Sequence, residues 1–274
     1  MRQINSRTFR YVAQLFFCNL LSFIFLSNFA NAAQMVEHLD RMEINWSTQK
    51  IRFYGESGVS ENALKGVDGA EKRAWADGLT YIENSIHDLS VADFEGLSSN
   101  TEKVTAEARI AAKNVTKSVY SLNTIFFGNG AVRVYLESSL PKALATSMIR
   151  FRQKEAASAQ LLHKTGLILK LNGRAQPKPR YRVVDEVGLP LFEAGDMAED
   201  AFGRNLMGRW FEAPADAESA EFVGKSPITI DASLNQEGSI VVPREVWTTN
   251  LDGHQSLLVN GLIAIVVPPV QTNN

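Results

Sequence analysis

The sequence predicts an α+β protein made of two small modules behind a removable leader. Three observations carry this prediction. An apolar run occupies residues 15–29, residues 42–137 change between the periodicities of strands and of helices, and residues 165–267 consist largely of short apolar runs separated by Gly and Pro. We expect the first module to be an antiparallel sheet with two helices on one face, and the second to be mainly β with short helices.

Residues 1–32 have the composition of a secretory signal peptide. Arginines precede the apolar run, no acidic residue interrupts it, and residues 30–32 read Ala-Asn-Ala, which suits cleavage after Ala32. An uncleaved membrane anchor is the alternative. It needs about twenty uninterrupted apolar residues, whereas Asn19 and Ser22 break this run. We therefore expect export to the periplasm and loss of the leader, with association to the outer membrane left open.

The mature chain is expected to be acidic and free of cysteine. The whole sequence has a net charge of -2, and the leader takes away three positive charges and no negative ones, which leaves -5. Cys18 is the single cysteine and lies within the leader. The mature chain would then have neither disulfide bonds nor thiolate metal sites, and no electrostatic reason to bind nucleic acid.

The first module is expected to span residues 33–141 and to begin with a pair of strands. Met42, Ile44 and Trp46 alternate with polar residues, and residues 51–53 alternate again after a polar turn. This is the pattern of strands with one buried face. Trp46 is interpreted as a core anchor in preference to a ligand platform.

Two amphipathic helices are expected to follow. Apolar residues recur at spacings of three and four over residues 70–89, with Asp68 as the expected cap, and again over residues 104–122. A short strand is expected between them at residues 91–97.

A hairpin is expected to close the first module. Residues 124–127 and 131–137 resemble strands, and Gly128-Asn129-Gly130 between them offers the glycines that a tight turn needs. These glycines are not interpreted as a dinucleotide loop, because no third glycine and no helix follow.

Residues 142–164 are expected to form a helical or partly ordered linker. Their basic residues are interpreted as a solvated helix face, with a patch for acidic lipid or cell wall as the alternative. The second module is expected over residues 165–269. Its strands are expected at residues 165–171, 181–188, 189–192, 208–211, 227–231, 239–242 and 261–267.

Two features of the second module are more specific. The last apolar run lacks polar alternation, which predicts a strand covered on both faces. Pro243 is expected to open a short helix whose apolar side consists of Val246, Trp247 and Leu251.

We predict no catalytic residue, no cofactor and no metal site. Four histidines stand singly in the sequence: His38, His87, His163 and His254. None has a partner at metal-binding spacing, and a hydrolase would need a Ser or Asp to meet His87 or His254 in space. The acids of residues 193–200 lack the EF-hand pattern and are interpreted as the first turn of a short helix. Asp185-Glu186-Val187-Gly188 is interpreted as a β-turn.

Three segments of the first module resemble the repeated domain of a bacterial envelope family. They read IRFYGES at 51–57, AEKRAWADGLTYIE at 70–83 and GAVRVYLESSLP at 130–141. This family comprises small outer-membrane lipoproteins and the flagellar assembly protein T, a component of a ring around the flagellar motor.

The second module resembles one found in many exported bacterial proteins, often directly after the first. The likeness covers TGLILKLNG at 165–173, KPRYRVVDEVGLPLF at 178–192, FVGKSPITIDA at 222–232, SIVVPREVW at 239–247 and GHQSLLVNGLIAIVV at 253–267. Lys170 and Leu171 stand where the family usually shows an acidic residue, so the resemblance by itself implies no ligand role for that loop.

The expected function is that of an exported, non-enzymatic structural or assembly protein of the cell envelope. The resemblance implies partners among envelope or flagellar-ring proteins, with homo-oligomers, outer membrane and cell wall also open. Sheet edges and the strand of Trp210 and Phe211, together with Trp46, are the expected contacts, because exposed aromatic strands serve pairing. The alternative is a periplasmic binding module for cell-wall glycan or lipid, with a pocket lined by Trp46, Trp75 or Tyr81.

Overall fold

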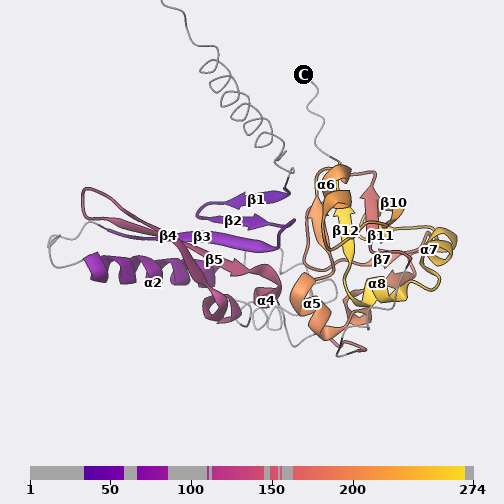
Figure 1. The fold of residues 1–274 in the computed structure, drawn as a ribbon, viewed down its shortest axis with the longest axis horizontal. Helices are drawn as coiled ribbons and strands as arrows, with labels where there is room; N and C mark the ends of the chain where they lie inside the picture. The colour runs from indigo at the N-terminus through magenta and orange to yellow at the C-terminus, as the bar shows by residue number, and fades with distance from the viewer. Residues whose placement is uncertain are drawn as a thin grey trace, which may run out of the picture. The chain divides into compact units, whose positions relative to one another are not determined.

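The computed structural model describes residues 34–58, 67–85, 110, 113–144, 149–153, 155 and 163–268 (Figure 1). These residues form a five-stranded sheet and a seven-stranded sheet together with helices, which confirms the α+β class. The leader expected at residues 1–32, the strand expected at residues 91–97 and His87 lie outside the described residues. None of the helices within the described ranges is long and apolar enough to cross a membrane.

The first sheet is antiparallel throughout and has the strand order β1-β2-β3-β5-β4. Its strands are β1 (Val36–Leu39), β2 (Met42–Asn45), β3 (Lys50–Ser57), β4 (Tyr120–Phe126) and β5 (Val132–Ser139). The expected strand pair and hairpin are both confirmed, whereas β1 was not predicted. In the hairpin turn, Gly130 has a φ of +82° and its N–H donates to the Phe127 carbonyl at 2.9 Å.

Helix α2 (Val67–Ser85) packs on one face of this sheet, along β3 and β5 (Figure 1). Its closest approach joins Gly55 of β3 to Gly78 of α2. A Cβ atom on Gly55 would lie 1.9 Å from the Ala74 carbonyl oxygen, so only glycine fits there. The helix expected at residues 70–89 is confirmed as far as Ser85, and residues 86–89 lie outside the described residues. Its start at Val67 puts Asp68 in the first turn and not at the cap.

The second expected helix ends earlier than its apolar spacing indicates. Residues 113–118 are helical, and Val115 is buried as the apolar stripe predicts. Pairing of Tyr120 with Glu137 then begins the ladder between β4 and β5. The extension of this helix to Leu122 was therefore wrong, because strand pairing overrides a spacing that suits a helix.

The second sheet is mixed and has the order β8-β7-β11-β10-β6-β12-β9. Its strands are β6 (Leu167–Leu171), β7 (Val183–Val184), β8 (Pro190–Phe192), β9 (Arg209–Phe211), β10 (Ile228–Leu234), β11 (Ile240–Val241) and β12 (Ile263–Val266). The four neighbours β10, β6, β12 and β9 are parallel. Each expected strand is present, although residues 181–188 contribute only two strand residues because the expected turn begins at Asp185.

Helices pack on both faces of the parallel strands. On one face, Phe202 of α5 (Glu199–Asn205) and Trp247 of α7 (Arg244–Leu251) share a core with Leu169 of β6. On the other, Ala217 of α6 (Pro214–Ser219) packs with Ile168. Three further short helices are η2 (Ala194–Asp196), α4 (Leu140–Leu144) and α8 (Gln255–Val259).

The two specific expectations for the second module have different outcomes. All of β12 is buried, which confirms a strand covered on both faces. Helix α7 begins directly after Pro243, as expected, and buries Trp247 and Leu251. Val246 was wrongly assigned to the apolar side and is 38% exposed, because residues one apart on a helix do not share a face.

Candidate functional site

Sheet edges are the places where one chain can pair with another, and the two sheets have four edge strands. Two of them are short and carry protective residues. β1 has four residues and includes Glu37 and His38, while β8 has three residues and begins at Pro190. Charges and proline both discourage further strand pairing.

The edge strand β9 is closed by the turn between β2 and β3. Ser47 Oγ donates to the Trp210 carbonyl at 2.6 Å, and the Trp210 N–H donates to the Trp46 carbonyl at 3.4 Å. Gln49 Nε2 donates to the Gly208 carbonyl at 2.9 Å. Ser47 and Gln49 are buried, so these bonds form away from solvent.

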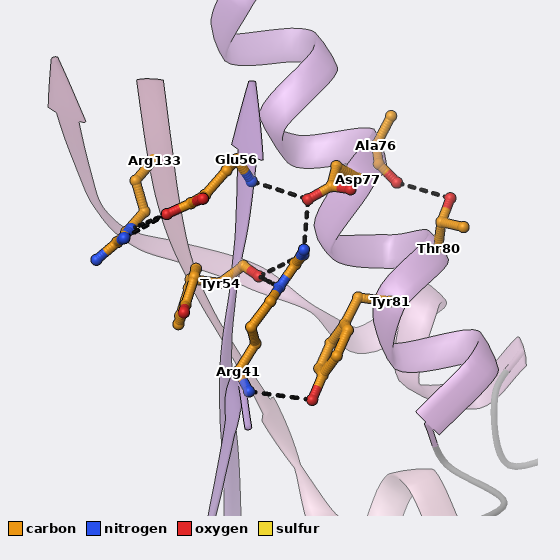
Figure 2. Close-up of polar contacts among 8 residues, drawn as sticks. All are labelled: Arg41, Tyr54, Glu56, Ala76, Asp77, Thr80, Tyr81 and Arg133. Carbon is orange, nitrogen blue, oxygen red and sulfur yellow. Dashed lines mark hydrogen bonds and ion pairs between the residues drawn. The ribbon is translucent and has the colours of Figure 1, made fainter. Parts of the chain in front are cut away.

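The end of β3 is closed by side chains as well (Figure 2). The ladder with β2 ends at Phe53, which leaves the outer backbone groups of Tyr54 and Glu56 without a strand partner. Arg41 donates to the Tyr54 carbonyl at 3.0 Å and to Asp77 Oδ2 at 2.6 Å. The same Asp77 oxygen accepts the Glu56 N–H at 2.9 Å.

Aromatic rings hold this arrangement in place (Figure 2). The Arg41 guanidinium lies 4.5 Å from the ring centre of Tyr81 on α2, and the Tyr81 hydroxyl accepts the Arg41 N–H at 3.1 Å. Arg133 lies 4.4 Å from the Tyr54 ring and pairs with Glu56. The charges therefore neutralise one another and fasten α2 to β3, which is a structural role.

A second charge cluster lies on the sheet face opposite α2. Glu137 accepts hydrogen bonds from Lys50 at 2.9 Å, from Arg52 at 2.8 Å and from the Tyr120 hydroxyl. Burial alone would raise the pKa of Glu137, but the bonds from Tyr120, Arg52 and Lys50 outweigh it and lower this pKa to about 2. Glu137 is thus charged near neutral pH and cannot serve there as a general acid.

The remaining edge strand, β4, is open. It has seven residues, and Tyr120, Leu122, Ile125 and Phe126 are each between 37% and 54% exposed. Within the described ranges, no backbone group pairs with its outer edge. Sequence reasoning anticipated strand residues here but missed their exposure. The available signal was the absence of any charged residue from residues 118–132.

The aromatic residues singled out from the sequence lie inside the protein. Trp46, Trp210 and Phe211 are 4%, 2% and 6% exposed. Their selection as partner contacts is corrected, because β9 is an edge strand whose edge and side chains are both covered. The interpretation of Trp46 as a core anchor agrees with this placement.

The three rings expected to line a pocket for glycan or lipid pack with the hydrophobic core of the described residues. Trp46 is buried, while Trp75 and Tyr81 are partly buried and pack against the core. Tyr81 is also engaged with Arg41.

The acids and histidines of the described part do not assemble into a metal site. No group of three or more His, Asp or Glu side chains there could hold a metal ion. Asp196 accepts the Glu193 N–H at 2.9 Å and pairs with Arg152, and Asp200 pairs with Arg204 at 3.4 Å. These acids have structural partners, as acids around helix starts usually do.

Asp185 organises the predicted turn. Its carboxylate accepts the N–H groups of Val187 at 3.0 Å and Leu189 at 2.7 Å, and Arg244 at 2.7 Å. Burial would raise the pKa of Asp185, but Arg244 and the two backbone donors lower it. Gly188, with φ +85°, completes the turn. The carboxylate is fully engaged and holds the β7–β8 turn against α7.

Comparison with protein-family models and with curated proteins finds no match for this sequence. The resemblance to the envelope family therefore stays a prediction, and the open edge of β4 is the surface from which function can be argued.

Proposed function

We propose that this chain is a non-enzymatic assembly component of the bacterial cell envelope, exported by its leader, which associates with a second copy through β4. The open edge of β4 is the observation that carries the proposal. The predicted leader and the resemblance to outer-membrane and flagellar-ring proteins support the address and the kind of role.

The contrast among edge strands supports β4 as the contact. Short length, charge or proline protects β1 and β8, and buried hydrogen bonds close β9. Natural proteins protect free edges in these ways to prevent pairing. β4 is longer, uncharged and free of proline, and its exposed apolar side chains become buried when another strand adds to it.

The charge pattern favours an identical strand as the partner. A two-fold interface brings the same patch of both copies together, and like charges opposite one another destabilise a strand pair. Residues 118–132 contain no charged side chain, so two β4 strands can pair antiparallel without such repulsion. Leu122 and Ile125 of each copy would then lie in the interface.

The oligomeric state tests this pairing. Sedimentation analysis of the purified protein should show a concentration-dependent dimer. The double variant Leu122→Lys/Ile125→Lys should be monomeric at the same concentrations, because four added charges face one another in the pair. The matched control Val187→Lys/Leu189→Lys changes two exposed apolar residues of a turn in the second sheet and should remain dimeric.

A wild-type protein that stays monomeric at every concentration would overturn the pairing, as would dimers that persist in the β4 variant. The envelope address has its own test. Fractionation and mass measurement should find the chain in the periplasm, beginning at Ala33. A cytoplasmic chain with an intact leader contradicts the address alone.

Deletion of the gene tests the biological role. Motility or envelope integrity should fall, and the Val187→Lys/Leu189→Lys gene should restore it where the β4 variant does not. Unchanged motility and unchanged envelope integrity in the deletion strain would count against the proposed function.

A further inference from the structure

A cavity opens at the carboxyl ends of three neighbouring parallel strands of the second sheet. Its volume is about 510 Å³, which lies in the range of small-molecule sites. The lining residues follow these strands closely. Residues 174–176 come after β6, Glu212 comes directly after β9, and Val267 and Pro268 come directly after β12. Met35 adds a further apolar side chain.

The connections that follow two of these strands reach helices on opposite faces of the sheet. After β6 the chain continues through β7 and β8 to α5 on one face, and after β9 it continues to α6 on the other. β12 lies between β6 and β9. Connections that diverge in this way leave a crevice at the carboxyl end of the sheet, and such switch points are where ligands bind to open α/β sheets.

The lining carries one positive and one negative side chain. Arg174 and Glu212 both face the cavity, and within the described ranges neither makes an ion pair or a hydrogen bond through its side chain. Met35, Ala175, Val267 and Pro268 supply an apolar surface beside them. A guanidinium recognises a carboxylate, and a carboxylate recognises an ammonium group, through charge-assisted hydrogen bonds.

We propose that this cavity binds a small zwitterionic ligand of the short-peptide class, with its carboxylate on Arg174, its ammonium on Glu212 and its apolar side chains on Met35 and Val267. Peptides combine these three features, whereas a purely anionic ligand would leave Glu212 opposed to like charge. The inference is independent of pairing through β4, since none of the lining residues belongs to the first sheet's open edge.

Calorimetric titration of the purified protein with the dipeptide alanyl-leucine tests the site. Saturable binding is expected. Arg174→Gln and Glu212→Gln should each weaken it about tenfold, the effect of losing one charge-assisted hydrogen bond. The matched substitutions Arg150→Gln and Glu221→Gln remove exposed charges that do not line the cavity and should leave the affinity unchanged.

Two capped peptides separate the two contacts without relying on the variants alone. N-acetyl-alanyl-leucine lacks the ammonium and should bind the wild type about tenfold more weakly than alanyl-leucine does. Its affinity should not fall further in Glu212→Gln. Alanyl-leucine amide lacks the carboxylate. It should bind the wild type about tenfold more weakly than alanyl-leucine does, and its affinity should not fall further in Arg174→Gln. The absence of saturable binding up to about 10 mM, or a capping penalty that persists in both variants, would overturn the proposal.

Discussion

Among the described residues, the first sheet keeps one polar face and one edge strand open to solvent, whereas the central strands β6 and β12 of the second sheet are covered on both faces, and its edge strand β9 is closed. In β3 the side chains alternate between burial against α2 and exposure, while every residue of β12 is buried. In the described part, α2 covers the buried face of β3 and β5, and Val115 of the helical residues 113–118 adds to the same core. Helices cover both faces of β6 and β12, and the turn of residues 46–49 closes the edge of β9.

This difference separates the two tasks that a sheet edge can perform. At the edge of β9, the carbonyl groups of Trp210 and Gly208 accept hydrogen bonds from Ser47 and Gln49 of the same chain. At β4 no described residue pairs with the edge groups, which lie next to exposed apolar side chains. Buried polar bonds of this kind stabilise the fold, whereas an open edge contributes little to stability and offers a contact.

The largest effect is expected where the first sheet meets helix α2. Gly55→Ala would place a methyl group 1.9 Å from the Ala74 carbonyl oxygen and 2.3 Å from the Gly78 nitrogen. Since both contacts are with backbone, α2 must move away from β3. We expect a loss of about 4 kcal/mol in the free energy of unfolding, measured in urea. The control Gly128→Ala meets no atom within 4 Å and should lose less than about 1 kcal/mol. Equal stability of the two variants would contradict the close packing of α2 on β3.

A smaller loss is expected at the closed edge of β9. Gln49→Ala removes the side-chain amide that donates to the carbonyl oxygens of Asn205 and Gly208. Leaving them unpaired should lower the free energy of unfolding by about 2 to 3 kcal/mol. Thr48→Ala alters the exposed neighbour in the same turn and should change stability by less than about 0.5 kcal/mol. A neutral Gln49→Ala would show that the turn only touches β9 without stabilising it.

The charged face of the first sheet should make stability depend on acid. The pKa of Glu137 is lowered from 4.5 to about 2 in the folded chain. The stabilisation that the charged carboxylate adds to the folded state is therefore fully present above pH 4.5 and is lost as the pH falls toward 2. At neutral pH, Glu137→Gln should cost about 1 to 2 kcal/mol. Urea unfolding from pH 7 to pH 2 should show the two proteins converging. A difference that stays constant over this interval would mean that the carboxylate's charge is not what stabilises the cluster.

Local patterns in the sequence predict most of the strands and the helix α2. Alternation of apolar and polar residues identifies β3 and β5, because these strands are buried on one face. Continuous apolar runs identify β6 and β12, because these strands are buried on both faces. No local sequence pattern predicts that β6 pairs in parallel with β10 and β12, because the paired residues are about sixty to a hundred positions apart.

The sites were harder to predict, because they depend on contacts between distant segments. The sequence predicts an exposed aromatic strand at Trp210 and Phe211, but the turn that contains Ser47 covers the outer edge of this strand. Gln49 looks like an ordinary turn residue, although it is buried and has a φ of +57°. Leu122 fits helical spacing, and only the ladder with β5 places it on an open strand.

The smallest effect on stability is expected at the open edge. The Leu122 side chain is 47% exposed, so Leu122→Lys removes little buried apolar surface and adds a charge that water can solvate. The monomer should keep its free energy of unfolding to within about 0.5 kcal/mol, whereas Ile44→Lys, which puts the same charge on a fully covered β2 position, should prevent folding. Urea unfolding at a concentration too low for dimers measures the monomer alone. If Leu122→Lys lost 2 kcal/mol or more there, another part of the same chain would have to cover β4, and the contrast between its open edge and the closed edge of β9 would no longer hold.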